Sequence, residues 1–274
     1  MARPKTDLSV LRSTTKDKLD PDKIKSNLKT KNIGRKIIVY NSVSSTNDVA
    51  AEYAKSRGNS GLVVFAEEQN AGRGRGGARW LSAYAESILC SIVLTDCRLN
   101  GELLSLTCAV AVAEAVGKSG SSEAKIKWPN DIILNGKKAG GILLESKTSN
   151  GSTAYIIGIG INCHQTTDSF PAELKPVATS IDIESRSYVD RISLAKRLLT
   201  SIDHWLEVAA KASEKVIEQW CKLSVQIGHG VTLIFNGTRF SGNCIGIDPQ
   251  AGLILQLDTG GVRMFDAAHT TIAK

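Results

Sequence analysis

The sequence of 274 residues carries 34 Lys and Arg against 27 Asp and Glu, a net charge of +7, and 42% of it is hydrophobic. Residues 1–36 hold 11 basic and 4 acidic residues, and the rest is balanced at 23 of each, so a neutral body is expected and a nucleic-acid-binding domain is disfavoured. The composition suffices for a full core and excludes disorder for most of the chain, and no apolar run approaches the ~20 residues that cross a bilayer.

The first 34 residues are polar and Lys-rich, and we expect a basic, flexible tail without a core, in which only residues 22–28 are conceivable as a short helix. A β-branched strand is predicted at 35–40, followed by a helix that Ser44–Asn47 can cap and Gly58 can stop. An Ala- and Leu-rich buried helix is predicted at 103–116. Further strands are expected at 62–66, 88–94, 125–127, 132–134, 140–145 and 155–161.

The C-terminal half changes its periodicity. Residues 188–209 have apolar residues at helical spacing, and a shorter helix is predicted at 213–222. From residue 231 the pattern alternates with a period of two between turn signals, which predicts hairpins and a small β-barrel. We therefore predict an α+β fold with three parts: a tail at 1–34, a mixed-sheet catalytic domain at 35–226 and a barrel at 227–274.

The six cysteines form no C-x-x-C pair and no zinc spacing with the four histidines. Most of them stand in apolar surroundings, so buried free thiols in a reducing compartment are favoured over disulfides or a catalytic thiol. The N-terminus lacks the apolar core of a secretory signal, and its four Asp argue against a transit peptide. A cytoplasmic protein is expected.

The most informative segment is the loop Gln69–Trp80, in which Gly and Arg alternate. Its glycines satisfy the dinucleotide motif G-x-G-x-x-G, but only residues 80–87 separate the loop from the next strand, too few for the helix that this motif requires. No Walker A loop is present. Glycine permits close backbone approach and arginine binds phosphate or carboxylate, so the pattern predicts a flexible clamp for an anionic ligand. The alternative, a disordered Gly/Arg linker, is disfavoured by the buried strands on both sides.

Four more motifs accompany this loop: Ser45-Thr46-Asn47, Lys127-Trp128-Pro129-Asn130-Asp131, Lys138 to Glu145, and Gly158-Ile159-Gly160-Ile161-Asn162. Together and in order, over about residues 37–274, they resemble the biotin protein ligase family, whose signatures read S-T-N, G-R-G-R-x-G, K-W-P-N-D, K-x-x-G-I-L-x-E and G-x-G-I-N. Lipoate ligases share the catalytic fold and are the alternative, but they lack the combined Gly/Arg loop and K-W-P-N-D.

This resemblance implies an ATP-dependent ligase that works in two steps. Biotin is first activated with ATP and Mg²⁺ to biotinyl-5′-AMP, and the biotinyl group then passes to a lysine of a biotin carboxyl carrier domain. Because the carboxylate and the phosphates repel each other, catalysis should rest on positioning and charge neutralisation. Asn130 and Asp131 suit Mg²⁺ or the incoming amine, and whether Asp131 holds the metal or deprotonates the lysine stays open.

The motif alignment also implies a role for each site residue. The expected catalytic residues are Arg73, Lys127, Asp131 and Lys138, with Asp131 also the candidate Mg²⁺ ligand. The expected biotin-binding residues are Ser45, Thr46, Asn47, Gln69, Gly72, Arg73, Gly74, Arg75, Lys138, Gly141, Gly158 and Gly160. The expected ATP and adenylate residues are Arg75, Trp80, Asn130 and Asn162. Ordinary core packing is an equal alternative for Trp80 and Trp128, and a strand kink is an alternative for Gly158 and Gly160.

Two departures from the family pattern matter. Residues 76–78 read Gly-Gly-Ala where repressor-type members carry further arginines, so the loop should hold the adenylate less tightly while still retaining it. Bifunctional members carry an N-terminal winged helix, which the short polar tail cannot supply. We therefore expect a monofunctional ligase that binds neither operator DNA nor membranes, with a dispensable tail. Monomer and homodimer both stay open, as do carrier docking and ATP-site closure as roles of the barrel.

Overall fold

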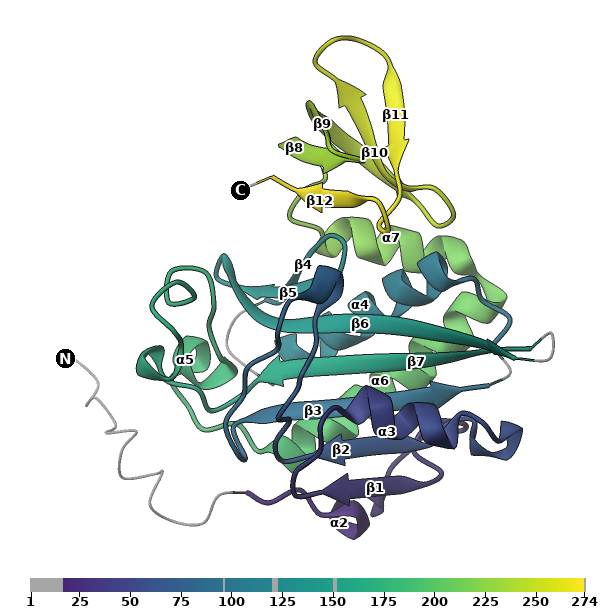
Figure 1. Ribbon diagram of the computed structural model, residues 1–274, viewed down its shortest axis with the longest axis vertical. Coiled ribbons are helices and arrows are strands. Elements are labelled where there is room, and N and C mark those ends of the chain that lie inside the picture. The colour runs from purple at the N-terminus through teal and green to yellow at the C-terminus, as the bar shows by residue number, and fades with distance from the viewer. Residues whose placement is uncertain (1–16, 96, 120–122, 150–151, 274) are drawn as a thin grey trace.

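A seven-stranded mixed sheet forms the centre of the computed structural model, which describes residues 17–95, 97–119, 123–149 and 152–273 (Figure 1). The strand order is β1-β2-β3-β7-β6-β5-β4, in which β1 and β2 are parallel and the other neighbours antiparallel. The α+β fold with a mixed sheet is confirmed. The strands are β1 (Ile37–Tyr40), β2 (Val63–Ala66), β3 (Ser87–Leu94), β4 (Lys125–Lys127), β5 (Asp131–Leu134), β6 (Lys137–Ser149) and β7 (Ser152–Asn162).

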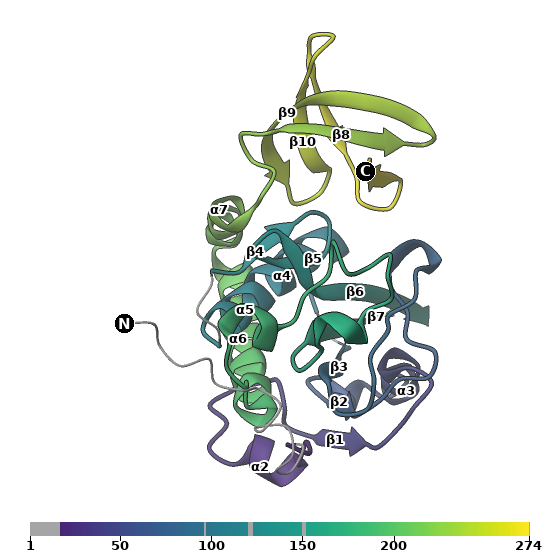
Figure 2. The same ribbon diagram turned by 90° about the vertical axis from the view of Figure 1, so that its left-hand side faces the viewer.

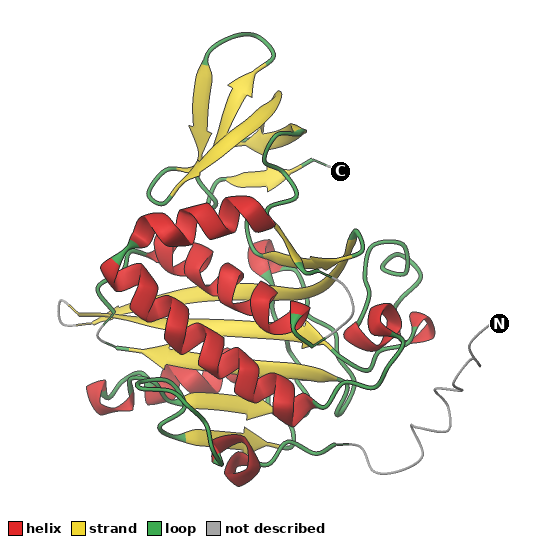
Figure 3. Ribbon diagram, turned by 180° about the vertical axis from the view of Figure 1, so that it is seen from behind, coloured by secondary structure: helices red, strands yellow, loops and turns green. Residues whose placement is uncertain are grey.

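Three helices cover one face of this sheet: α4 (Gly101–Gly117), α6 (Arg191–Lys211) and α7 (Ser213–Leu223) (Figure 3). Helix α4 packs against α6, α7 and the sheet, which explains why its Ala- and Leu-rich sequence shows no polar stripe. Helix α3 (Thr46–Tyr53) lies on the opposite face (Figure 2), where Ser45 caps it by accepting a hydrogen bond from the Asn47 amide. The long loops and the 3₁₀ turns η1 (Arg57–Asn59), η2 (Arg75–Gly77) and η3 (Thr167–Ser169) complete the domain.

A second, five-stranded antiparallel sheet follows α7 and stands at one end of the molecule (Figure 1). Its order is β11-β10-β9-β8-β12, and within the described residues β11 and β12 do not pair with each other, so the hydrogen-bonded ladder does not close into the predicted barrel. The strands are β8 (Gly230–Phe235), β9 (Thr238–Asp248), β10 (Gly252–Leu257), β11 (Val262–Phe265) and β12 (Thr270–Ile272).

The described part of the expected tail, residues 17–34, is packed rather than flexible, so the prediction is wrong there; residues 1–16 lie outside the described part. Asp20 caps the short helix α2 (Pro21–Lys25), and the side chains of Leu19, Ile24 and Ile33 are buried in the core. Composition misled the prediction because three apolar anchors, dispersed among lysines, form no periodic pattern.

The remaining elements agree with the predictions except at particular ends. Helix α6 begins at Arg191 rather than at residue 188, because Asp190 caps it by accepting from the Ser193 amide. Strands β6 and β7 extend beyond the predicted ranges, and the helix α5 (Ile181–Ser185) and strand β12 were not expected. Among the described residues no helix is both long and apolar enough to span a bilayer.

The six cysteines are free thiols, as predicted. Four are buried, and burial raises the pKa of Cys163 to about 12 and that of Cys244 to about 11. These thiols therefore stay protonated at neutral pH and are unsuited to nucleophilic chemistry.

Candidate active site

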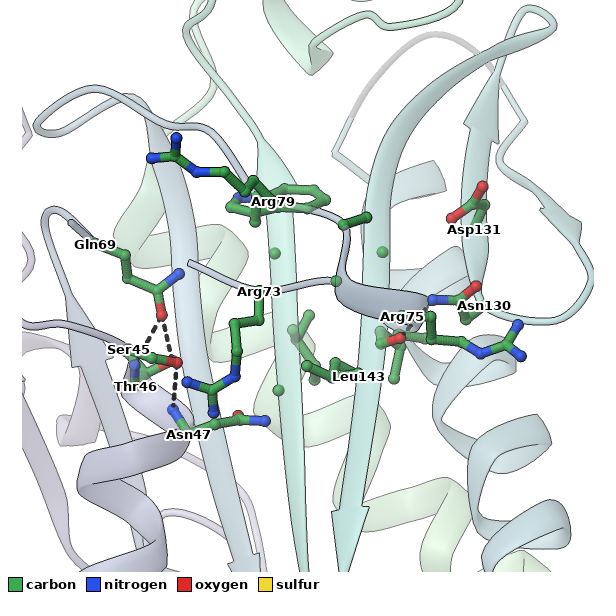
Figure 4. Close-up of a pocket in the computed structure, with 18 of the residues that line it drawn as sticks. Ser45, Thr46, Asn47, Gln69, Arg73, Arg75, Arg79, Asn130, Asp131 and Leu143 are labelled. Carbon is green, nitrogen blue, oxygen red and sulfur yellow. Dashed lines mark hydrogen bonds between the residues drawn. The ribbon is translucent and has the colours of Figure 1, made fainter. Parts of the chain in front are cut away.

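A polar pocket opens on the α3 side of the large sheet and encloses about 230 Å³ (Figure 4). The start of α3, the Gly/Arg loop, the start of β5 and the β6–β7 hairpin form its walls. Four cationic side chains but a single carboxylate belong to its lining: Arg73, Arg75, Arg79, Lys138 and Asp131. This balance of charge suits an anionic ligand.

The first turn of α3 is fixed by side-chain hydrogen bonds (Figure 4). The amide and hydroxyl of Thr46 donate to Gln69 Oε1 at 2.7 and 3.0 Å, and Asn47 Nδ2 donates to Glu145 Oε2 at 3.0 Å. Beneath them, the Ser91 hydroxyl of β3 lies 2.8 Å from Thr46 Oγ1 and 2.6 Å from Asn47 Oδ1. Ser91 was not among the predicted site residues, because a single serine in an apolar strand belongs to no motif. Satisfied polar groups in a buried position hold one geometry, so this wall is preorganised.

Glycines on β6 and β7 leave room for two side chains of the pocket itself. A Cβ at Gly158 would stand 2.5 Å from Asn47 Oδ1, and one at Gly160 would stand 2.5 Å from the Trp80 ring. A Cβ at Gly141 would meet the same ring at 3.3 Å. The Trp80 indole therefore packs closely against the sheet at Gly141 and Gly160, and its buried Nε1 has no hydrogen-bond partner within the described part of the chain.

The two arginines of the Gly/Arg loop point in different directions (Figure 4). Arg73 forms a forked ion pair with Asp48, at 3.1 and 2.8 Å, and a third contact of 3.3 Å with Glu145. These carboxylates outweigh partial desolvation and raise the pKa of Arg73, while the hydrogen bond from Arg73 lowers the pKa of Asp48. Arg75 instead donates to the backbone carbonyl of Ala267, between β11 and β12. The loop is thus anchored to α3 by one arginine and to the C-terminal sheet by the other.

Lys138 and Asp131 form a close ion pair on the wall opposite α3. Lys138 Nζ lies 2.6 Å from Asp131 Oδ1 and 5.8 Å from the centre of the Trp80 ring. Lys127 is the cross-strand partner of Asp131, so the two side chains leave the same face of the β4–β5 hairpin. Lys127 is exposed and stands outside the pocket lining. Asn130 Nδ2 donates to the carbonyl of Ile142 at 2.7 Å, which fixes its side chain at the rim.

A second, more apolar cavity of about 610 Å³ adjoins the pocket. The two share Ala78, Arg79, Trp80 and Lys138, and Asn162 at the end of β7 lines only the second. Its apolar wall comes from the loop between β7 and α5, with Phe170, Leu174 and Val177 among its residues. This wall was not predicted, because the loop has no motif and no periodicity. A cationic pocket and an apolar cavity that meet at one lysine can hold an anion beside a flat aromatic group.

Most of the predicted site residues meet in this region. The pocket brings together Ser45, Thr46, Asn47, Gln69, Arg73, Gly74, Arg75, Trp80, Asn130, Asp131, Lys138, Gly141, Gly158 and Gly160. Three predicted residues lie outside the pocket lining. Gly72 is buried within the loop, where a Cβ would stand 2.7 Å from the Trp80 carbonyl, Lys127 is exposed, and Asn162 lines the second cavity.

Residues 39–162 match the model of the Biotin/lipoate A/B protein ligase family. The chain is 34% identical over 255 residues to the bifunctional ligase/repressor BirA of Bacillus spizizenii, covering 91% of this chain and 78% of the relative. It is 30% identical over 261 residues to the biotin–[acetyl-CoA-carboxylase] ligase of Mycobacterium tuberculosis, covering 90% and 94%. The biotin protein ligase of Aquifex aeolicus, solved in complex with biotin and ATP, has the same fold, with a TM-score of 0.76 at 24% identity over 88% of this chain and 99% of that one.

Fold and pocket thus define a protein ligase of the biotin/lipoate class. Within this class the chain belongs to the biotin protein ligase family. The expected resemblance is confirmed, and the lipoate ligase alternative is not favoured.

Proposed function

We propose that the protein activates biotin with ATP to biotinyl-5′-AMP and transfers the biotinyl group to a lysine of a biotin carboxyl carrier domain. The observation that carries this function is the junction at Lys138, where a cationic pocket meets an apolar cavity. The names of two relatives, both biotin–[acetyl-CoA-carboxylase] ligases, support biotin as the acid and a carboxylase carrier as the acceptor.

In the proposed ground state biotin lies in the pocket with its polar ring toward Thr46, Asn47 and Gln69. Its carboxylate lies toward Lys138, and the adenine of ATP occupies the second cavity against Phe170 and the Trp80 ring. The buried Nε1 of Trp80, which has no partner among the described residues, supplies a donor for the bound ligand. The order of the two compartments fits a molecule with a polar head, an acyl centre and a nucleoside.

In the first step a carboxylate oxygen of biotin attacks the α-phosphorus of ATP, and the bond to the pyrophosphate oxygen breaks. Both reactants are anions, so the site must lower their repulsion. Lys138 lies where these charges meet, and Arg73 can exchange Asp48 and Glu145 for ligand oxygens without losing charge-assisted hydrogen bonds. Arg75 would follow the phosphates by leaving the Ala267 carbonyl.

In the second step the lysine amine of the carrier attacks the acyl carbonyl and AMP leaves. Asp131 is the one carboxylate of the described pocket lining, so it is the proposed acceptor of the amine proton once Lys138 turns to the ligand. Lys127, exposed on the same face as Asp131, stands where it can contact the departing phosphates or the carrier.

Magnesium would be held mainly by the ATP phosphates. No group of three or more His, Cys, Asp or Glu with metal-binding geometry occurs in the part of the chain that the structure describes. The Asp131 carboxylate and the Asn130 amide oxygen fit the one or two protein ligands that Mg²⁺ commonly takes beside phosphates. When bound, Mg²⁺ would neutralise phosphate charge.

The test is to incubate the protein with ATP, Mg²⁺, a carrier domain and either biotin or lipoate. We expect pyrophosphate release that depends on biotin, and a mass increase at a single carrier lysine. Lipoate transfer without biotin transfer would overturn the proposal. Omitting the carrier should leave biotinyl-AMP bound to the protein, and its immediate release would reject the expectation that the Gly/Arg loop retains it.

That the protein does not bind operator DNA stays a prediction. The described residues 17–34 contain a single five-residue helix, which supports it for that segment. Gel-shift titration against the promoter of its own biotin genes measures it, and sequence-specific, salt-resistant binding would contradict it.

A further inference from the structure

Asp17, at the start of the described chain, joins a buried ionic cluster beneath the second cavity. Its carboxylate accepts from Arg191 Nε at 2.7 Å and from the Arg191 backbone amide at 2.7 Å, and its carbonyl accepts from the guanidinium at 2.7 Å. The Arg191 side chain is fully buried, and its other nitrogen donates to Glu67 Oε2 at 2.9 Å. A buried guanidinium is stable only while its partners remain, so Asp17 completes a site that Glu67 cannot complete alone.

The same carboxylate reaches a histidine of the loop after β7. His164 Nε2 lies 3.3 Å from Asp17 Oδ1, and His164 Nδ1 lies 2.8 Å from Asp182 Oδ2. The imidazole stacks on the Tyr188 ring, with centroids 4.2 Å apart and planes at 9°. Asp17 therefore links α6 to the strand end that leads into the apolar wall of the cavity.

The cluster contacts the floor of the second cavity through Ser87. The Arg191 guanidinium donates to the Ser87 carbonyl at 3.0 Å. The Ser87 hydroxyl accepts from Gln165 Nε2 at 2.6 Å and from the Ser82 hydroxyl at 2.9 Å, and both of these residues line the cavity. Ser87 also pairs with Asn162 in the β3–β7 ladder. Three hydrogen bonds thus connect Asp17 to the cavity lining, through Arg191 and Ser87.

The segment that carries Asp17 is held at a second point of α6. Asp203 accepts from the backbone amides of Lys31, Asn32 and Ile33 at 2.7, 2.9 and 3.0 Å. We call residues 17–34 the N-terminal strap. Since its apolar anchors are buried and both its ends are bonded to α6, the strap is a packed part of the folded domain.

We propose that Asp17 of the N-terminal strap is a positioning residue for the nucleotide half of the active site. It fixes Arg191 and His164, and through Ser87 these residues hold Ser82, Gln165 and Asn162 in place. The inference rests on the proposed function, because it takes the second cavity to be the ATP site. The strap thus has a role in catalysis, although residues 17–34 were expected to belong to a dispensable tail.

The experiment compares Asp17→Asn with Asp22→Asn in the full chain. Both substitutions remove one negative charge from the strap, but Asp22 is exposed and its side chain has no ion pair with another described residue. For Asp17→Asn we expect the KM for ATP to rise roughly fivefold or more while the KM for biotin changes less than about twofold. For Asp22→Asn both constants should match the parent protein. An Asp17→Asn protein that is only less heat-stable, with both KM values unchanged, overturns the proposal.

If Asp17→Asn does not fold, Asp17→Glu replaces it, because Glu keeps the charge and adds one methylene. The expected result is a smaller rise in the KM for ATP, again without a change for biotin, and equal changes in both constants would count against the strap. The parent protein separates the two levels of inference. If it fails to transfer biotin, the proposed function fails; if it transfers biotin and Asp17→Asn behaves like Asp22→Asn, only the inference about the strap fails.

Discussion

At the scale of single residues, Lys138 supplies a positive charge where the two cavities meet. Its ammonium belongs to the lining of both cavities, and Asp131 holds it at 2.6 Å. In the proposed first step this single positive charge would face both the carboxylate of biotin and the α-phosphate of ATP. Because the ion pair is half-exposed, it contributes little to folding, so the effect of losing it should fall on chemistry.

Lys138→Ala is expected to lower the rate of biotinyl-AMP formation about 10²- to 10³-fold, because it removes a preorganised charge at the reacting centre. Biotin-dependent pyrophosphate release measures this. The control is Lys137→Ala, which removes the neighbouring charge of the same strand outside the pocket lining. Near-normal pyrophosphate release by Lys138→Ala would contradict the assigned role.

Gly160→Ala tests how closely the sheet and the Trp80 ring approach. The added methyl would stand 2.5 Å from the ring, so the indole must leave its position. We expect a loss of about 1–3 kcal/mol in the free energy of unfolding, as in other overpacked sites, together with weaker ligand binding. Urea denaturation and biotin titration measure both. In Gly230→Ala the methyl enters open space without backbone strain, and this control should lose neither stability nor affinity.

At the scale of elements, the pocket depends on how α3 is seated on the sheet. The Ser91 hydroxyl of β3 holds the first turn of α3 through Thr46 and Asn47, and Gln69 holds it from the Gly/Arg loop. The functional groups of α3 therefore owe their direction to a strand and a loop as much as to their own helix. Removing the Ser91 hydroxyl leaves two buried polar atoms with fewer partners.

Ser91→Ala is expected to lower the free energy of unfolding by about 1–2 kcal/mol and to raise the KM for biotin, while the KM for ATP stays near the parent value. Chemical denaturation and steady-state kinetics measure the two effects. Ser241→Ala is the matched control, because Ser241 also bonds a threonine hydroxyl. Its partner is Thr232, at 2.9 Å, and both lie in the C-terminal sheet. Equal kinetic effects in both variants would exclude a specific role for Ser91.

At the scale of the whole molecule, helix α6 joins the strap, the sheet and the second cavity. Burial alone would lower the pKa of His164, but hydrogen bonds and charge from Asp17 and Asp182 outweigh it and raise this pKa. The other groups around the imidazole are Tyr188, whose pKa is raised, and Arg191, whose pKa is also raised. Near neutral pH Tyr188 stays neutral and Arg191 stays positively charged. His164 is therefore the group of this cluster that titrates near neutral pH.

The stability of the protein is therefore expected to depend on pH in a defined direction. The folded-state pKa of His164 lies above its unfolded value of about 6.5. The contribution of His164 to the free energy of unfolding is therefore complete below the unfolded pKa and is lost as pH rises through the folded pKa. Asp17 has a lowered pKa and contributes a constant amount in this range. Urea midpoints measured at pH values from 6 upward should fall in the parent protein.

His164→Gln provides the comparison, because glutamine keeps an amide donor but does not titrate. We expect its stability to be lower at acid pH and nearly independent of pH across the same range. His229→Gln, at an exposed histidine, should retain the slope of the parent protein. If the urea midpoint of the parent protein instead rises with pH over this range, the cluster stabilises the neutral form of His164, and the prediction is contradicted.

Local signals in the sequence were sufficient for much of this protein. The order of strands and helices followed from periodicity and capping residues such as Ser45, because these act within a few neighbouring residues. The Gly/Arg loop and the motifs around Asp131, Lys138 and Gly160 indicated an anion pocket, since each carries its chemistry within a few residues. The family followed from their joint presence.

Only the tertiary structure decided which partners those residues have. Arg73 bonds Asp48 and Glu145, Arg75 bonds Ala267, and Ser91 holds α3, and such contacts between distant segments leave no periodic trace. The excess of basic residues near the N-terminus was a misleading guide to the packing of this segment for the same reason. Residues 17–34 looked like a solvated tail because lysines are frequent in them, yet three buried apolar anchors and the partly buried Asp17 bind this strap to the body.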